Sequence, residues 1–164
     1  WDSSQRGPAP PERAPMSSSV STAPFSTAWA RDVVAPAIRV AVVDDHPLVR
    51  DSIRRLLGGQ LDMEWVGEAS DGAEAVELVA RTSPDVVLMD LSMPGTDGLT
   101  ATQQVVSLFT DTRVLVLTTS ADPSRFRRSM DAGAAAVVDK DGNPATVLAG
   151  IRDVARATGS AEPA

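Results

Sequence analysis

The 164-residue sequence contains no cysteine and no tyrosine, a single histidine (His46) and a single lysine (Lys140). Without cysteine the chain has no disulfide, no thiolate metal ligand and no cysteine nucleophile. It also lacks any apolar run near the roughly 20 residues that a membrane-spanning helix requires, so we expect no membrane partner. Lys140 stands out because the other 14 basic residues are all arginines.

The sequence also has no excess of basic residues. The 15 basic residues are outnumbered by 22 acidic ones, which gives a net charge of −7. Domains that hold nucleic acid neutralise phosphates with a basic surface, so direct nucleic-acid binding by this chain is not expected. Residues 1–37 carry three charges of each sign, and the whole of the −7 therefore belongs to residues 38–164.

Residues 1–37 lack apolar periodicity and contain six of the 12 prolines and seven serines. Such a segment buries too little apolar surface to offset its ordering entropy, which predicts a disordered N-terminal tail. It has neither the basic start nor the continuous apolar core of a secretory signal, so we expect a cytoplasmic protein. The sequence opens on Trp1, and Met16 is an alternative start. Residues 159–164 are predicted to form a short C-terminal tail.

From Ile38 onward, short β-branched runs alternate with amphipathic stretches, a pattern typical of βαβ units and a parallel sheet. The predicted strands cover 38–43, 63–67, 85–89, 113–117 and 134–138. We therefore predict one α/β domain over residues 38–158, built on a doubly wound five-stranded parallel sheet. Ligands of such folds bind at the carboxyl ends of the strands, near the point where the strand order reverses.

The stretches between these strands carry helix start signals. Pro47 and Pro144 suit first helical positions, Asn143 precedes Pro144 as a cap, and Asp71 with Glu74 resembles a capping box. The first predicted helix runs from Pro47 to the stop at Gly58, the second begins at Asp71, and the fifth begins at Pro144. The third and fourth cover 99–109 and 123–132. Each helix follows a strand, as expected for a sheet covered on both faces.

Polar side chains stand at the ends of the predicted strands: Asp44 and Asp45, Asp90, Thr118, and Lys140. Three carboxylates at one sheet edge repel and raise one another's pKa values unless a cation lies among them. Oxygen donors favour a hard ion, Mg²⁺ or alternatively Mn²⁺. A carboxylate can also attack phosphorus to give an aspartyl phosphate, with a metal, a hydroxyl and an ammonium meeting the phosphoryl charge. The pattern thus predicts metal-assisted phosphoryl chemistry.

Each of these residues also has an ordinary structural interpretation. The acidic pair before Pro47 can cap the first helix, Asp90 can begin a turn, and Lys140 can be a solvated surface residue. His46 is either a ligand or base beside the acidic pair or, more commonly for such a position, an exposed residue at a helix entry. The placement of all of them at successive strand ends favours a shared site.

Six segments of the sequence together resemble a known family. The relevant segments are Val42–Arg50 (VVDDHPLVR), Asp85–Gly95 (DVVLMDLSMPG), Asp97–Leu99, Val114–Thr119, Ala132–Ala134 and Lys140–Asp141. In this order they resemble the receiver domain of bacterial two-component response regulators, and most of all its LuxR/NarL-type subfamily. The resemblance implies the flavodoxin-like fold of CheY-type receivers and a sensor histidine kinase as partner.

The resemblance also implies roles for individual residues. Asp90 would be the phosphoacceptor, and Asp45, Asp90 and the backbone carbonyl of Ser92 would ligate Mg²⁺, with Asp44 acting largely through water. Thr118 would hydrogen-bond a phosphoryl oxygen, and Lys140 would pair with the phosphoryl group. Ser92 and Ser120 would border the path of the hydrolytic water.

Two residues depart from the family pattern. Val137 stands where the family usually carries an aromatic switch residue, three positions before the lysine. Asp139 directly precedes Lys140, where an apolar residue is common. Its carboxylate either distorts the end of the last strand, holds Lys140 away from the site or points to solvent.

Several functions remain open at this stage. The first is a phosphorylation-controlled switch whose output face comprises 123–132, 134–138 and the helix from Pro144. That face carries three arginines and three aspartates that suit a homodimer, or equally a solvated surface: Arg125, Arg127, Arg128, Asp139, Asp141 and Asp153. The second is an interaction module that works without phosphorylation.

An aspartate-dependent phosphatase is disfavoured, because Ser92 stands where those enzymes place a second aspartate. Subfamily members normally continue into a helix-turn-helix domain, for which the sequence after residue 158 leaves no room. A role in transcription is therefore expected only within a longer protein.

Overall fold

A computed structural model of the chain describes residues 35–119 and 122–159. The predicted tail therefore lies outside the described residues except for 35–37, which form neither helix nor strand, and Ser120 and residues 160–164 lie outside them too. In the described ranges no helix combines the length and apolarity that crossing a membrane would take.

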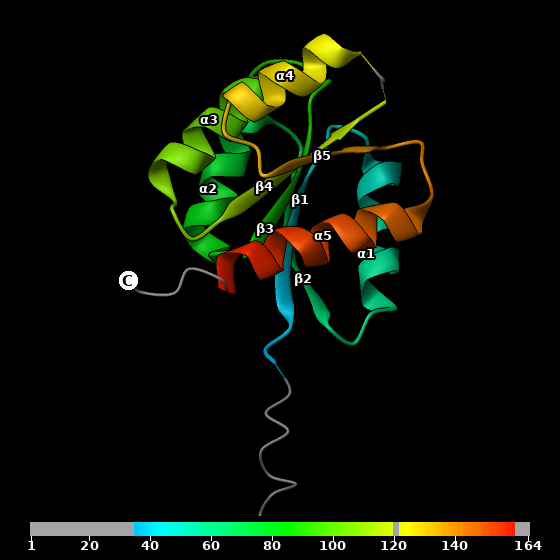
Figure 1. Ribbon diagram of the computed structural model, residues 1–164. Helices are drawn as coiled ribbons and strands as arrows, with labels where there is room; N and C mark the ends of the chain where they lie inside the picture. The colour runs from blue at the N-terminus through cyan, green and yellow to red at the C-terminus, as the bar shows by residue number, and fades with distance from the viewer. Residues whose placement is uncertain (1–34, 120–121, 160–164) are drawn as a thin grey trace, which may run out of the picture. The chain divides into compact units, whose positions relative to one another are not determined.

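Five strands alternate with five helices in the described part of the chain (Figure 1). The elements are β1 (Ile38–Val43), α1 (Pro47–Gly58), β2 (Met63–Ala69), α2 (Gly72–Thr82), β3 (Val86–Asp90), α3 (Gly98–Leu108), β4 (Arg113–Thr118), α4 (Pro123–Asp131), β5 (Ala136–Asp139) and α5 (Pro144–Gly159). All strand pairs are parallel and the order is β2-β1-β3-β4-β5. The prediction of a doubly wound flavodoxin-like sheet is confirmed.

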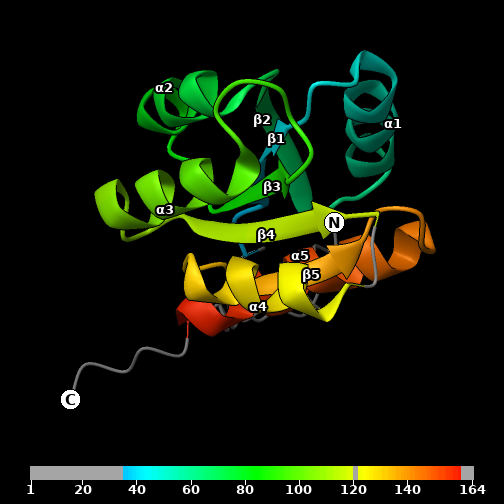
Figure 2. The same ribbon diagram turned by 90° about the horizontal axis from the view of Figure 1, so that it is seen from above.

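Helices cover both faces of the sheet, as Figure 2 shows from above. All five residues of β3 are buried, which agrees with its nearly continuous apolar sequence. One apolar cluster joins the strands to α2 and α3 through Leu78, Val79 and Val105. The other joins them to α1 and α5 through side chains such as Leu57 and Ile151. Full burial of each such side chain contributes about 1.5–3 kcal/mol, so both helix layers are firmly fixed to the sheet.

Helix α4 is attached differently. Its only buried residue is Ser129, and Phe126 and Met130 on the same helix stay exposed. It begins at Pro123, where the Asp122 carboxylate accepts a hydrogen bond of 2.9 Å from the backbone N–H of Ser124. Few apolar contacts therefore oppose a displacement of α4.

The last strand begins later than its sequence predicted, at residue 136 rather than 134. Gly133 has a φ of +99°, and the Ala134 N–H donates to the Ser129 carbonyl at 3.0 Å, so both residues close the turn after α4. The Ala135 N–H is the first to reach β4, at the Val114 carbonyl. Strand β5 consequently extends through Asp139 and ends next to Lys140.

Candidate functional site

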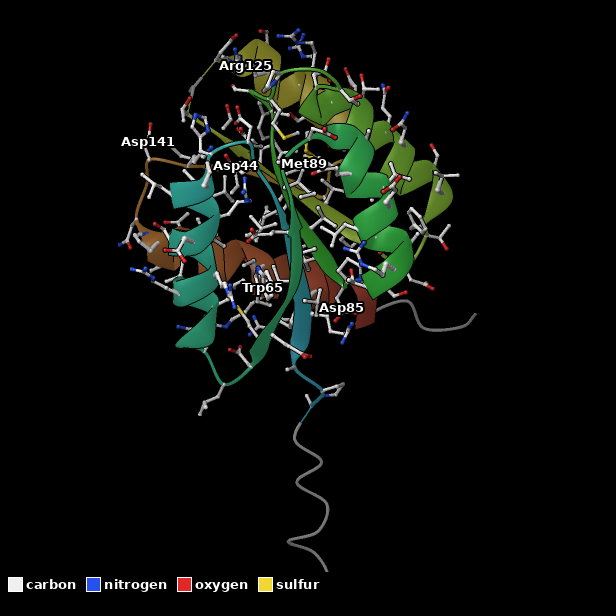
Figure 3. The ribbon with its side chains drawn as sticks, turned by 180° about the vertical axis from the view of Figure 1, so that it is seen from behind. Asp44, Trp65, Asp85, Met89, Arg125 and Asp141 are labelled. Atoms are coloured by element: carbon white, nitrogen blue, oxygen red, sulfur yellow. The ribbon has the colours of Figure 1, made fainter. Side chains whose placement is uncertain are left out.

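The candidate site lies at the carboxyl edge of the sheet, beside the strand β1 at which the order reverses. Asp44 follows β1 and Asp90 is the last residue of β3, its neighbour in the sheet. The backbone N–H of Asp44 donates to the Ala69 carbonyl at the end of β2, which extends the sheet by one bond. Figure 3 shows Asp44 near the upper ends of the strands and Asp141 on the loop that follows β5.

The acidic cluster consists of Asp44, Asp45 and Asp90. Asp44 and Asp90 are only 1% and 2% exposed, and Asp45 is half-buried. One ligand atom from each of them and one from His46 all lie within 4.8 Å of one another. Burial raises the pKa of Asp90, and the Asp44 charge raises it further, against the lowering effect of the Ser92 N–H and of Lys140. The sequence prediction that the three carboxylates converge is confirmed.

Lys140 reaches into this cluster from the end of β5. Its Nζ lies 2.5 Å from Asp44 Oδ2 and 3.5 Å from Asp90 Oδ1, and its side chain is only 11% exposed. Its backbone N–H donates to the Thr118 carbonyl at 2.8 Å, which fixes the end of β5 against β4. The interpretation of Lys140 as a solvated surface lysine is therefore wrong.

Asp139 does not hold Lys140 away from the acids. Its side chain is exposed, and Oδ1 accepts a hydrogen bond of 2.9 Å from the Asp141 N–H. The carboxylate thus stabilises the turn after β5. Val137, where the family usually has an aromatic residue, is half-buried and packs against the cluster that includes α2 and α3.

His46 combines both interpretations of its sequence position. Its side chain is 60% exposed, yet Nδ1 lies 3.1 Å from Asp44 Oδ1 and 2.9 Å from Asp45 Oδ1. It is the N-cap residue of α1 and makes no side-chain cap, so the acidic pair does not cap that helix. Instead, Asp44 Oδ1 accepts from the His46 N–H at 2.8 Å, which orients the carboxylate.

The two oxygens of Asp90 have different surroundings. Oδ1 accepts a hydrogen bond of 3.2 Å from the Ser92 N–H and lies near Lys140. Oδ2 is buried and has no hydrogen-bond partner in the part of the chain that the structure describes. Thr118 is buried at the end of β4, one residue beyond Leu117, which pairs with Asp90. Ser120, the other predicted residue at this edge, lies outside the described ranges.

Sequence reasoning missed two residues that shape the site. A Cβ on Gly98 would lie 2.1 Å from the Asp90 carbonyl oxygen, so only glycine lets α3 begin against the end of β3. The signal was present in Asp97-Gly98, a capping aspartate followed by glycine. Arg50 Nη1 donates to the Asp44 carbonyl at 2.7 Å. Arg50 belongs to the segment Val42–Arg50 that carries the family resemblance, but the resemblance implies no role for it.

The donor set fits a hard divalent cation. The carboxylates of Asp44, Asp45 and Asp90 supply oxygen ligands, and Lys140 compensates only part of their charge. Such a set suits Mg²⁺ or Mn²⁺ rather than a metal that prefers sulfur. An acidic cluster of this kind is typical of the Mg²⁺ site of receiver domains.

Comparison with known families and proteins gives a consistent result. Residues 40–152 match the family described as response regulator receiver domain. The chain is 41% identical over 126 residues to the transcriptional regulatory protein LiaR of Bacillus subtilis (strain 168), covering 77% of this chain and 58% of LiaR. It is 42% identical over 117 residues to the response regulator UvrY of Escherichia coli (strain K12), covering 71% of this chain and 54% of UvrY. The chain thus spans little more than half the length of these curated relatives.

Solved structures show the same similarity. The signal receiver domain of the response regulator NarL from Mycobacterium tuberculosis is 37% identical, with a TM-score of 0.70 over 74% of this chain and 98% of that domain. A LuxR-family two-component response regulator from Aurantimonas sp. SI85-9A1 is 34% identical, with a TM-score of 0.71 over 74% of this chain and 86% of that one.

Proposed function

Because the chain belongs to the response regulator receiver family, whose domain is a phosphoacceptor rather than an enzyme, we propose that Asp90 accepts a phosphoryl group from a sensor histidine kinase. The relatives include LuxR/NarL-type regulators, as the sequence indicated. The observation that supports Asp90 most strongly is the contrast between its two oxygens. One is held by the Ser92 N–H, whereas the other is buried without a partner among the described residues.

The proposed step is an in-line transfer to the carboxylate. Asp90 Oδ2 attacks phosphorus, and the P–N bond to the kinase's phosphohistidine breaks, with its electron pair returning to the imidazole nitrogen. Lys140 already lies 3.5 Å from Asp90, so its ammonium can pair with a phosphoryl oxygen. The Thr118 hydroxyl would donate a hydrogen bond to another. Ser92, through its N–H, keeps the acceptor carboxylate oriented.

Asp45, Asp90 and the backbone carbonyl of Ser92 would hold Mg²⁺, or alternatively Mn²⁺, and Asp44 would act largely through water. When bound, the ion supplies positive charge that neutralises the acids and the incoming phosphoryl oxygens. Asp44 also forms an ion pair with Lys140 and thereby positions the ammonium that would contact the phosphoryl group.

Labelling with a small phosphodonor tests this proposal. Wild-type protein incubated with Mg²⁺ and an acyl phosphate is expected to gain the mass of one phosphoryl group. Asp90→Asn is expected to gain none, since the amide is not a nucleophile, while its far-UV circular dichroism stays unchanged. Asp141→Asn is the matched control, because it removes an exposed carboxylate near the same edge and should be labelled like wild type.

Equal labelling of Asp90→Asn and wild type would place the acceptor elsewhere. Absence of labelling in wild type would favour an interaction module that works without phosphorylation, for which Val137 in place of the usual aromatic residue is the supporting observation. Valine at position 137 leaves all members of the acidic cluster in place. The phosphorylation-controlled switch is therefore the preferred proposal.

We propose further that the switch acts in the cytoplasm and that the α4-β5-α5 face forms a homodimer. The supporting feature is its charge pattern, with exposed Arg127 and Arg128 on α4, exposed Asp139 at the end of β5 and exposed Asp141 after it. Because LiaR is a transcriptional regulator, a transcriptional output is proposed for a longer protein that contains this domain. Sedimentation velocity before and after phosphorylation tests the dimer, and an unchanged monomer would contradict it.

A further inference from the structure

One arginine of α4 has a contact that its neighbours lack. Arg125 is half-buried, whereas Arg127 and Arg128 are exposed. Its Nη1 donates a hydrogen bond of 3.3 Å to Ser92 Oγ, across 33 residues of sequence. Ser92 in turn donates its N–H to Asp90 Oδ1 at 3.2 Å. A single residue therefore separates the guanidinium of Arg125 from the acceptor carboxylate.

The same guanidinium faces an open hollow beside the acidic cluster. This hollow, of about 340 Å³, is lined by Leu91, Ser92, Asp97, Leu99, Arg125 and Arg128. It lies between α4 and the segment that follows Asp90. The one acid in its lining, Asp97, caps α3 by accepting from the Thr100 N–H at 2.8 Å. The hollow thus gives Arg125 room to move from Ser92 toward the end of β3. Figure 3 shows Arg125 at the same end of the sheet as Asp44.

Charge provides the driving force. An aspartyl phosphate carries about two negative charges where the Asp90 carboxylate carried one, beside the remaining carboxylates of Asp44 and Asp45. Lys140 is engaged by Asp44, so its charge is shared from the outset. Arg125 donates to a neutral hydroxyl, and its charge otherwise acts on the exposed Asp122, whose pKa it helps to lower. A guanidinium binds two phosphoryl oxygens at once and is suited to this geometry.

We propose that Arg125 is a further phosphoryl-binding residue, which exchanges the Ser92 hydroxyl for the phosphoryl oxygens on Asp90. The inference rests on the proposed phosphorylation of Asp90. Arg125 belongs to α4, whose only buried residue is Ser129, so the exchange draws this weakly packed helix toward the site. The residue thereby links the phosphoryl group to the output face without an aromatic side chain at position 137.

Labelling rates with the small phosphodonor and Mg²⁺ test this role. Arg125→Gln is expected to slow phosphoryl uptake by about three- to tenfold, between the effect of losing an exposed ion pair and that of losing a buried charged hydrogen bond. Arg125→Lys keeps the charge but loses the two-point contact, and it should recover part of the rate. Arg127→Gln is the matched control, since it removes the same charge from an exposed position of the same helix. Its rate should remain within about twofold of wild type.

The outcomes separate this inference from the function on which it rests. If wild type is labelled and Arg125→Gln is labelled as fast as Arg127→Gln, Arg125 does not bind the phosphoryl group, while Asp90 remains the acceptor. If wild type takes up no phosphoryl group at all, both proposals are wrong. Equal slowing by Arg125→Gln and Arg127→Gln would show a general effect of surface charge and would also contradict the inference.

Discussion

At the scale of single residues, the choice of lysine at position 140 is the most informative feature. The chain otherwise uses arginine for all 14 of its remaining basic residues, yet an ammonium contacts both Asp44 and Asp90. A compact ammonium on a flexible stem fits between two buried carboxylates, whereas a planar guanidinium needs more room. Position 140 therefore carries lysine because of the limited space inside the site, although the rest of the chain uses arginine.

Lys140→Arg is accordingly not a conservative change. We expect phosphoryl uptake by this variant to fall about tenfold or more, because the larger group cannot keep both contacts in a side-chain position that is 11% exposed. Initial labelling rates of the two proteins at equal Mg²⁺ and phosphodonor concentrations provide the measurement. Matching rates would remove Lys140 from the phosphoryl site.

At the scale of the elements, sequence signals found every helix and strand but not the contacts between their ends. Short β-branched runs predicted the five strands, and proline and aspartate at helix starts predicted α1, α2 and α5. The start of β5 was misplaced, because the alanines after Gly133 carry no signal that separates turn from strand. The contact of Arg125 with Ser92 depends on side-chain conformation across 33 residues, which no local pattern encodes.

The junction between β3 and α3 is expected to be the element boundary least tolerant of substitution. Gly98→Ala places a Cβ 2.1 Å from the Asp90 carbonyl oxygen, so either α3 or the acceptor strand must shift. We expect a loss of stability of about 1–3 kcal/mol, the usual cost of overpacking. Urea unfolding measures it. Gly58→Ala is the control, since its Cβ would meet nothing within 4 Å at the end of α1.

That control should leave stability unchanged or raise it by up to about 1 kcal/mol, because alanine is the better helix former. If Gly98→Ala unfolds at the same urea concentration as Gly58→Ala, the close approach of α3 to Asp90 is not a constraint on the fold.

At the scale of the whole molecule, the sequence predicted the parallel sheet and the edge at which the site lies, because both follow from strand periodicity. Predicting that carboxylates at strand ends converge required no side-chain detail. The pairing of Lys140 with Asp44, and the contact of His46 with both neighbouring carboxylates, did require it. Sequence patterns therefore locate the site, and tertiary packing decides which residues touch.

An ion pair between distant segments contributes to the stability of the whole fold. Arg152 of α5 donates from Nε to Asp62 Oδ2 at 2.7 Å and from Nη2 to Asp62 Oδ1 at 3.0 Å, across 90 residues. The hydrogen bonds from Arg152 lower the pKa of Asp62 below its ordinary value of 3.8. The folded state therefore favours the carboxylate. The resulting stability is present above that ordinary value and is lost as the pH falls through the lower pKa of the folded protein.

Asp62→Asn should consequently melt below wild type at pH 7, and the difference between the two should shrink as the pH falls below about 4. Thermal unfolding at a series of pH values measures this. Asp51→Asn removes a carboxylate that is about as exposed as Asp62 but pairs with Arg55 only within one helix, so its effect should be smaller. A difference for Asp62→Asn that stays constant from pH 7 to the acid range would show that the ion pair is not its origin.

If Asp90 accepts the phosphoryl group with the help of a divalent cation, the label must lie on this residue and depend on the ion. Mapping the label by tandem mass spectrometry tests it most directly. After reaction with an acyl phosphate and Mg²⁺, followed by tryptic digestion, the phosphoryl group should lie on Asp90 within the peptide of residues 82–113. Chelation of the metal before the reaction should abolish the label. A label on any other residue would rule out Asp90 as the acceptor, and a label that forms equally well without a divalent cation would rule out the role of the metal.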